Sequence, residues 1–335
     1  MSTLILDRSD LEIRLDGDAL ALYEAAGRRG TVPIKLLDRV VMQGGVKLDA
    51  GVLTKLAEAG IATLLLSKRH SKRIAIVLGP AHNDAGIRLA QSRRVFDTEW
   101  CGAWAARQVR AKTRAQIRLL QEAQENRPDQ RKPLTDALAS LHTVQASLPL
   151  AQKGNEADFN PDIASLRGSE GAAARAYFQG LAALFPPALD FTGRNRRPPR
   201  DPVNACLSLG YTLLHFDAVR ACHMAGLDPL LGFYHRPSFG RESLASDLIE
   251  PLRPHLDRQI WQLFRTRALR EDQFSRDGNA CLLGKAGRGI FYQDYETHAA
   301  PVRRMLLRQC RTLARHLKAE GEPLLANEDE EENFA

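Results

Sequence analysis

One stretch of the sequence, GFYHRPSFGRESLASDLIEPLRP (232–254), combines a histidine with two carboxylates in the manner of a metal site. His235 stands in a loop bounded by two glycines, and Ser243 is predicted to begin a helix. Asp247 and Glu250 are three residues apart on that helix, so both carboxylates project from one face. Oxygen ligands together with an imidazole favour Mg²⁺ or Mn²⁺. The same spacing also fits a solvated helix face beside a surface loop, and this alternative stays open.

Another carboxylate, Glu170, lies upstream in the segment SLRGSEGAAARAYFQGL (165–181). Ser169 is predicted to cap a helix that begins at Glu170, which places this acid in the first helical turn. Arg175 follows between one and two turns further along. A carboxylate in the first turn is favourable at any helix end, so the position by itself does not require a catalytic role.

Arginines surround these acids. A metal centre fringed by arginines suits phosphodiester chemistry, because the metal stabilises charge on the phosphate while guanidinium groups hold the DNA backbone. The alternative is that the arginines form salt bridges with the neighbouring acids. The candidates for DNA contact are Arg194, Arg196, Arg197 and Arg200 in a proline-rich loop, Arg175, and Arg236, Arg241 and Arg253 around the second motif.

A polar stripe is predicted on the helix that begins at Asp201, with a proline at its first position. Asn204, Ser208 and Tyr211 fall at spacings of four and three and therefore share a face. Asn204 and Tyr211 are candidates to line a DNA path beside the metal. A buried, hydrogen-bonded polar stripe within a helical core is the alternative.

The predicted secondary structure that positions these residues changes from strands to helices near residue 85. Up to about Pro80 the sequence shows short β-like runs separated by turn signals, with one helix between Asp49 and Gly60. Beyond that point, long segments with apolar residues at helical spacing dominate. The predicted fold class is α+β. Its expected parts are a small β-rich N-terminal domain (1–84), a larger all-α C-terminal catalytic domain (85–327) and an acidic, disordered tail (328–335).

The charge balance points to an anionic partner. The 335 residues contain 47 Lys and Arg against 40 Asp and Glu, a formal net charge of +7. Five of the acids are consecutive at 328–332, and without them 47 bases face 35 acids, or +12. A positive surplus on the body of a protein is typical of nucleic-acid binding, although ordinary basic surface chemistry gives the same count.

Composition also excludes several classes of protein. No apolar run approaches the roughly 18 residues of a membrane span, and the N-terminus lacks a signal-type apolar stretch. The five cysteines are odd in number and show no CxxC spacing, so neither a disulfide framework nor a structural zinc site is expected. We therefore expect a cytoplasmic protein without membrane contact. Only 6% of the residues are aromatic, which disfavours a protein built on stacking single-stranded bases.

The motifs together resemble the CRISPR-associated integrase family, the spacer-acquisition enzymes of prokaryotic adaptive immunity. The resemblance rests on E-G-x-A-A-R-x-Y-F (170–178), D-P-x-N-A-x-L-S-L-G-Y (201–211), and G-F-x-H with G-R-x-S-L-x-x-D-L-x-E-P-x-R-P (232–254). R-x-x-Q at 88–91 and the two-domain layout agree with it. The order of these motifs, spread over most of the chain, is far more specific than any one of them.

The resemblance implies a metal site formed by Glu170, His235 and Glu250, with Asp247 beside it as a further catalytic residue. It implies a metal-dependent DNA integrase or endonuclease that joins the 3′-hydroxyl ends of short foreign DNA to a CRISPR repeat by transesterification. A two-ended fragment needs two active centres, so we expect a homodimer with the β-rich domains as its interface. The expected partners are double-stranded DNA, namely spacer fragments and the CRISPR repeat, and a small companion protein that bridges two dimers.

Two other functions remain open at this stage. One is a non-catalytic DNA-binding or architectural protein, in which the acids serve only as ion-pair partners of the arginines. The other is a homologous transposon integrase that acts outside a CRISPR array. Dependence of strand joining on Mg²⁺ or Mn²⁺ separates the first alternative from the integrase, whereas salt-dependent DNA binding is expected of both.

Overall fold

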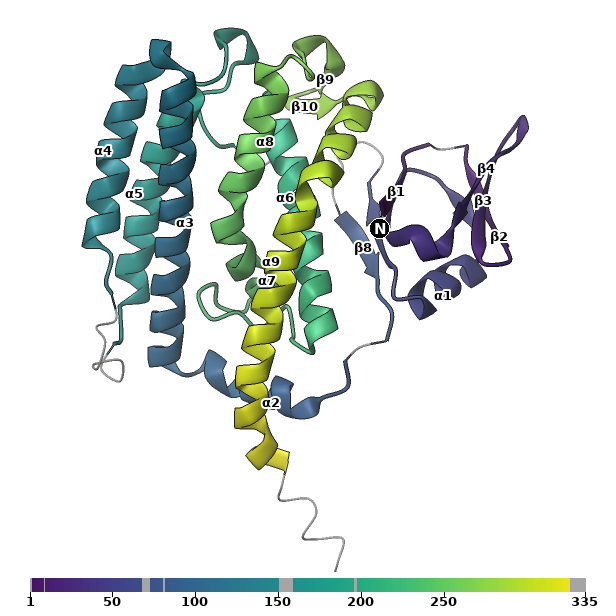
Figure 1. Cartoon of the computed structure of the whole chain (residues 1–335), viewed down its shortest axis with the longest axis horizontal. Coiled ribbons are helices and arrows are strands. Elements are labelled where there is room, and N and C mark those ends of the chain that lie inside the picture. Colours follow the sequence, from purple (N-terminus) through teal and green to yellow (C-terminus); the bar gives the residue numbers. More distant parts are fainter. Residues whose placement is uncertain are drawn as a thin grey trace, which may run out of the picture.

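Short strands form the first part of the chain and long helices form the rest (Figure 1). The predicted α+β fold class is confirmed, with one addition: the helical part contains a small antiparallel sheet of β9 (Phe274–Asp277) and β10 (Ala280–Leu283). The proposed divisions at residues 84 and 327 stay predictions, and the acidic segment 328–335 lies outside the described residues. The computed structural model describes residues 2–8, 10–67, 73–80, 82–150, 159–195 and 198–325.

The strands form two four-stranded sheets. In the first, the order is β1-β5-β7-β8, with β8 antiparallel and the other neighbours parallel. In the second, the order is β4-β3-β2-β6, and only β2 and β6 are parallel. The strands are β1 (Ser2–Leu6), β2 (Glu12–Asp16), β3 (Ala19–Glu24), β4 (Gly27–Pro33), β5 (Leu37–Gln43), β6 (Lys47–Leu48), β7 (Ala62–Leu66) and β8 (Arg73–Val77).

The first sheet separates two hydrophobic cores, because successive residues of a strand face opposite sides. On β5, Val40 and Met42 belong to the core of the N-terminal part, whereas Val41 belongs to the core of the helical part. On β7, Leu64 likewise faces the helices, and Leu65 packs against the other core. The N-terminal part is therefore joined to the helices by a shared sheet instead of a free linker.

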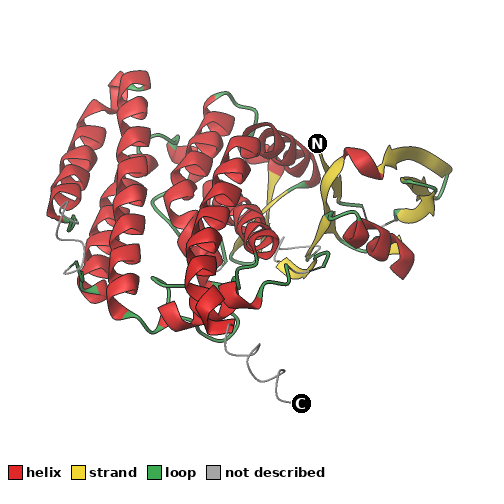
Figure 2. Ribbon diagram, turned by 60° about the horizontal axis from the view of Figure 1, so that its bottom comes forward, coloured by secondary structure: helices red, strands yellow, loops and turns green. Residues whose placement is uncertain are grey.

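Nine α-helices are described, and α3, α4 and α5 stand side by side as an antiparallel group next to α6, α8 and α9 (Figures 1 and 2). Short 3₁₀ turns lie at Ile34–Leu36, Pro128–Gln130, Pro187–Leu189, Glu250–Leu252 and Glu271–Gln273. The helices are α1 (Ala50–Glu58), α2 (Ala85–Val95), α3 (Thr98–Asn126), α4 (Arg131–Ser147), α5 (Ile163–Ala182), α6 (Pro202–Ala225), α7 (Ser243–Ile249), α8 (Arg253–Arg265) and α9 (Lys285–Leu325).

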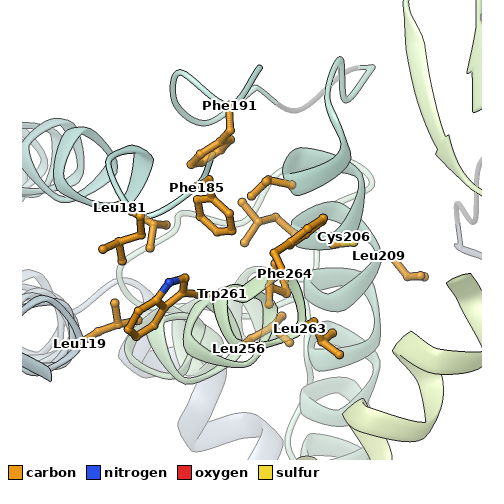
Figure 3. Close-up of a cluster of buried hydrophobic side chains, with 14 of the residues drawn as sticks. Leu119, Leu181, Phe185, Phe191, Cys206, Leu209, Leu256, Trp261, Leu263 and Phe264 are labelled. Atoms are coloured by element: carbon orange, nitrogen blue, oxygen red, sulfur yellow. The ribbon is translucent and has the colours of Figure 1, made fainter. Parts of the chain in front are cut away.

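The main core lies where these helices meet. Trp261 of α8 is 1% exposed, and Phe264 on the same helix packs edge-on against Phe185 (Figure 3). Leu119 of α3 and Leu181 of α5 belong to the same cluster. Each large apolar side chain that is fully buried contributes roughly 1.5–3 kcal/mol. This core fixes the relative positions of α3, α5 and α8, the helices that carry or adjoin the active-site residues.

The start of α5 differs from the prediction. The helix begins at Ile163 because the Asp162 side chain accepts hydrogen bonds from the backbone N–H groups of Ala164 and Ser165. Ser169 is therefore not the cap, and Glu170 lies in the second turn instead of the first. The carboxylate of Glu170 is therefore not stabilised by the free N–H groups of a helix N-terminus, and its partners must be other side chains.

A buried ion cluster ties the N-terminal strands to the helices. Arg39 of β5 is 2% exposed and pairs with Asp217 of α6 and Glu296 of α9. Arg303 also contacts both of these acids. Tyr295 donates a hydrogen bond to Asp217. Because removing one partner of a buried pair leaves an uncompensated charge, this cluster is intolerant of substitution.

We expect Gly321→Ala to destabilise the protein by about 1–3 kcal/mol, because α2 and α9 cross there without room for a side chain. A Cβ added at Gly321 would overlap the backbone oxygen of Gly86. Gly289→Ala, in the same helix but with nothing within 4 Å of the added Cβ, is the matched control and should be neutral or slightly stabilising. Urea denaturation of the two variants tests this difference, and equal stabilities would contradict the proposed close crossing.

Candidate active site

Two of the predicted carboxylates meet at a lysine. Glu170 of α5 and Glu250, which begins the 3₁₀ turn after α7, both contact Lys112 of α3. The Lys112 Nζ atom lies 2.5 Å from Glu170 Oε1 and 2.6 Å from Glu250 Oε2. The side chains of Glu170 and Glu250 are 19% and 7% exposed, respectively. The fold thus brings together carboxylates that are 80 residues apart in the sequence, with a cation between them.

Electrostatics keep Glu250 ionised. Burial raises the pKa of its carboxyl group, but the positive charges of Arg253 and Lys112 outweigh this effect and lower the pKa to about 2. Arg253 Nη1 lies 2.7 Å from Glu250 Oε1. Glu250 is therefore a buried anion at neutral pH and has the charge that a metal ligand requires.

Two further residues orient these carboxylates. The Tyr234 hydroxyl donates to Glu170 Oε2 at 2.5 Å, while Lys112 occupies the other oxygen. Burial and the neighbouring Glu170 raise the pKa of Tyr234, so its hydroxyl stays protonated and remains a donor. Lys112 and Tyr234 were not predicted as site residues. Tyr234 lies within a quoted motif, but Lys112 is in a long helix whose sequence shows only ordinary amphipathic spacing.

Asp247 holds the His235 loop in place. This side chain has no exposed surface, and its Oδ2 accepts hydrogen bonds from the backbone N–H groups of Phe233 and Tyr234, both at 2.9 Å. Its Oδ1 accepts from the backbone N–H of His235 at 2.9 Å and lies 2.7 Å from the ring Nδ1 of the same residue. Asp247 therefore has no free oxygen, and it leaves Nε2 as the nitrogen of His235 that can bind a metal.

The donor set fits a divalent cation in charge and in chemical type. Glu170 and Glu250 supply carboxylate oxygens on either side of the Lys112 ammonium group, and His235 supplies an imidazole nitrogen. Glu250 Oε2 is buried and accepts no aligned hydrogen bond. Within the described residues, however, no group of three or more His, Cys, Asp or Glu side chains is arranged closely enough to hold a metal ion.

Several predicted DNA contacts lie on the surface. Arg175 of α5 and Arg200 are exposed, as are Arg236 and Arg241 on either side of the tip of the His235 loop. Among the described residues, none of these four arginines has an acidic partner, so the salt-bridge alternative does not account for them. The predicted contacts at Arg196 and Arg197 fall outside the described residues.

The other predicted contacts within the described residues are fully or partly buried. Asn204 has no exposed surface, and its amide is bonded to Asp201, Arg194 and the carbonyl of Gly193. The predicted DNA contact at Asn204 is therefore corrected to a structural role: it fastens the preceding loop to α6. Arg194, another candidate for DNA contact, donates to both Asn204 and Ser208 and so packs its proline-rich loop against α6.

Tyr211 lies between this loop and the carboxylate cluster. Its hydroxyl donates to the buried Asp257 at 2.6 Å, and Arg194 and Arg253 stack on its ring at 5.4 and 4.8 Å from the centroid. Burial raises the pKa of Asp257 to about 6, although the hydrogen bonds from Tyr211 and Tyr177 oppose this shift. Because Arg253 also pairs with Glu250, Tyr211 supports the position of that arginine next to the carboxylates.

A second basic surface lies along α9. Cations at spacings of four and three residues line a hollow of about 640 Å³ between α9, the start of α2 and the end of α6. Asp84 contributes the one carboxylate in this lining and lies 3.7 Å from Lys318. Part of the surplus positive charge predicted from composition therefore lies on one helix face. Its members are Arg304, Arg308, Arg311, Arg315 and Lys318.

The family model for CRISPR associated protein Cas1 matches residues 4–297. The chain belongs to the Cas1 family. A curated relative, the CRISPR-associated endonuclease Cas1 1 of Thermodesulfovibrio yellowstonii, is 39% identical over 299 residues, which cover 88% of this chain and 91% of the relative. The predicted family and the endonuclease class of enzyme are therefore confirmed.

Solved structures share the fold over almost the whole chain. A Cas1 protein from Thermotoga maritima has a TM-score of 0.76 and 22% identity, covering 95% of this chain and 97% of its own. A casposase bound to an integration product has a TM-score of 0.80 and 21% identity, covering 96% and 91%. A Cas6-RT-Cas1–Cas2 complex has a TM-score of 0.77 and 23% identity, covering 95% of this chain and 35% of the other.

The Cas1 family is one of metal-dependent nucleases, which agrees with the predicted need for a metal without identifying the ion. The predicted Cas1 site residues Glu170 and Glu250 lie together in this structure, and Asp247 is bonded to His235. Among the helices of the described residues, none has the length and apolar character needed to cross a membrane.

Proposed function

We propose that this Cas1 protein is a metal-dependent DNA integrase that joins the 3′-hydroxyl ends of short foreign DNA to a CRISPR repeat, acting in the cytoplasm. The observation that carries the proposal is the meeting of Glu170 and Glu250 around one cation position, next to a histidine held by Asp247. Anionic ligands around a cation, with arginines at the rim, are the arrangement that phosphoryl transfer needs.

Glu170, His235 and Glu250 would hold Mg²⁺ or Mn²⁺. When bound, such an ion withdraws charge from the attacked phosphate and favours ionisation of the attacking hydroxyl. The protein fixes the ligands: Tyr234 and Lys112 orient Glu170, Arg253 orients Glu250, and Asp247 presents Nε2 of His235. Because each joining step exchanges one phosphodiester for another, the DNA 3′-oxygen serves as the nucleophile and no covalent protein intermediate is required.

The exposed arginines are proposed to hold the DNA backbone. Arg175, Arg236 and Arg241 lack acidic partners within the described residues, and each can place a guanidinium fork on a phosphate. Such contacts orient a duplex without reading its sequence. The row of cations on α9 extends the basic surface beyond the active site. A structural neighbour of this fold, the casposase, is bound to an integration product, which supports this class of substrate.

The proposed assembly is a homodimer, with the β-rich N-terminal parts as the interface. A DNA fragment with two ends needs two active centres, and a single chain supplies one. A small companion protein is proposed to bridge two dimers so that the centres are separated by the length of the fragment. The occurrence of the fold in a Cas6-RT-Cas1–Cas2 complex supports a partner protein of this kind.

A strand-transfer assay on a supercoiled plasmid tests the proposed function. The protein and a short duplex with free 3′-hydroxyl ends are incubated with plasmids that carry or lack a CRISPR repeat, with Mg²⁺, with Mn²⁺ or with EDTA. We expect relaxed, fragment-joined plasmid only when metal is present, and more of it with the repeat. DNA binding without joining in any metal would favour the architectural alternative, and equal joining to both plasmids would favour a transposon-type integrase.

A further inference from the structure

Phe239 is the most exposed large apolar residue among those described. Its relative exposure is 108%, compared with 83% for Phe96, the next highest. Exposed aromatic rings are common on surfaces as isolated residues and need no special explanation. Phe239 differs from these because of its position, at the tip of the loop that carries His235.

The loop tip is held in a defined shape. Ser238 and Arg241 form an isolated antiparallel bridge, with the Arg241 N–H donating to the Ser238 carbonyl at 3.1 Å. Gly240 takes the left-handed conformation that this tight turn requires, at φ +68°. Phe239 therefore projects from a closed turn, and the entropy that a flexible loop would lose on binding is already removed.

The base of the loop is fixed as well. The Ser243 hydroxyl donates to the Arg236 carbonyl at 3.1 Å. A Cβ at Gly232 would lie 2.6 Å from the backbone of Ser243, so the two ends of the loop are in close contact. His235 at the same base is bonded to Asp247. The turn thus extends from the same rigid frame that orients the candidate metal ligand.

The charges beside Phe239 and its distance from His235 indicate which kind of ligand its ring would contact. Arg236 and Arg241, on either side of the tip, are exposed and have no acidic partner within the part of the chain that the structure describes. Phe239 is four residues from His235, at most about 14 Å of extended chain. An apolar ring between two guanidinium groups suits a ligand with flat apolar faces flanked by negative charges. A nucleic-acid strand has both features, with stacked bases between two phosphate rows.

We propose that Phe239 is a base-stacking site, which packs on a nucleobase next to the phosphate that the active site attacks. Arg236 and Arg241 hold the phosphates on either side, and the ring inserts at a terminal or unstacked base. Apolar side chains that wedge between base steps are a general means of unstacking and kinking DNA. This proposal rests on DNA being the substrate, as in the proposed function. It adds a base contact to an active site otherwise described only by phosphate and metal chemistry.

Fluorescence of 2-aminopurine in short duplexes tests the proposal. The probe base is placed at each of the last three positions of the 3′ strand, or at the repeat boundary, and the full-length protein is added in EDTA. We expect binding to change the fluorescence at one or two adjacent positions. Phe239→Ala should remove this change and weaken binding about 5-fold to 150-fold, the range for loss of one stacked base.

Two variants serve as comparisons. Phe239→Trp keeps a flat ring and should preserve the response, with quenching of its own fluorescence by DNA. Phe96→Ala removes another highly exposed phenylalanine, at the end of α2, and should leave both the response and the affinity unchanged.

An unaltered 2-aminopurine response in Phe239→Ala would overturn the proposal. If that variant instead loses dimerisation or binding of a companion protein, with an unchanged response, the ring is a protein contact and the base-stacking site is refuted. The measurement is made without metal and without joining. A protein that fails the strand-transfer assay but shows a Phe239-dependent response would therefore refute the proposed integrase while leaving the base-stacking site in place.

Discussion

Replacement of Glu170 or His235 with alanine is expected to lower the rate of strand joining at least about a thousandfold, with duplex binding within a few-fold of the wild type. Loss of a metal ligand removes several kcal/mol of charge stabilisation from the transition state, and about 4 kcal/mol corresponds to a factor of a thousand. The folded core is preserved, because Glu170 is partly exposed and Lys112 keeps Glu250 as its partner. Initial rates of joining, measured alongside DNA affinity by fluorescence anisotropy, test both parts of this expectation.

Two controls make this result specific. Glu170→Gln keeps an oxygen to accept the Tyr234 hydroxyl but removes the charge, so it should be nearly as inactive as the alanine variant. Glu320→Ala removes a carboxylate of similar exposure, which pairs with Arg94 on another face, and should join DNA normally. Joining within about tenfold of the wild type by either the Glu170→Ala or the His235→Ala variant would contradict the proposed ligand set.

The parts of the fold that the sequence predicts correctly are determined by short-range chemistry. Asp49 accepts a hydrogen bond from the N–H of Val52 and begins α1, and Gly60 follows the helix at φ +70°. Asp201 caps α6 in the same way, with Pro202 at the first position. Each of these signals acts within three or four residues, so a single sequence contains all the information that they need.

The sequence is misleading at two places where local signals compete with tertiary packing. Ser169 is a plausible cap, but the helix continues through it because Leu166 and Ala173 on either side are both buried in the helical core. The segment VPIKLL (32–37) has the apolar character of a short strand, but its residues Ile34–Leu36 form a 3₁₀ turn that leads into β5. In both places tertiary packing overrides a local preference that was itself reasonable.

The contact of Lys112 with the two carboxylates could not be predicted from the sequence. It is 58 residues from Glu170 and 138 from Glu250, and only the packing of α3 against α5 and the turn after α7 brings the three together. The role of Asp247 was also beyond prediction, since spacing identified an acid near a histidine but not the backbone groups that it binds. Motif similarity locates the candidate ligands, whereas the residues that orient them become visible only in the fold.

Asp247→Ala is expected to have the largest effect on stability of any single change at this site. The substitution leaves the backbone N–H groups of Phe233, Tyr234 and His235 without their acceptor in a buried position. Each unpaired buried donor costs about 1–3 kcal/mol, so the expected loss in the free energy of unfolding is about 3 kcal/mol or more. The rate of strand joining should also fall about tenfold to a hundredfold in the protein that remains folded, because His235 loses the partner that fixes its ring.

Separating these two effects requires a control with similar destabilisation away from the site. Asp217→Ala serves this purpose, because Asp217 is also buried, and removing it leaves Arg39 with Glu296 as its one acidic partner among the described residues. Both variants should show lower midpoints in urea, but at a temperature where each is folded, only Asp247→Ala should join DNA poorly. Asp247→Asn keeps one oxygen that can accept hydrogen bonds but replaces the other oxygen with an NH₂ group, which faces backbone N–H donors. The stability of this variant should therefore lie between those of the wild type and the alanine variant. If Asp247→Ala unfolds at the wild-type urea concentration, the four hydrogen bonds do not hold the loop, and the orientation of His235 must have another cause.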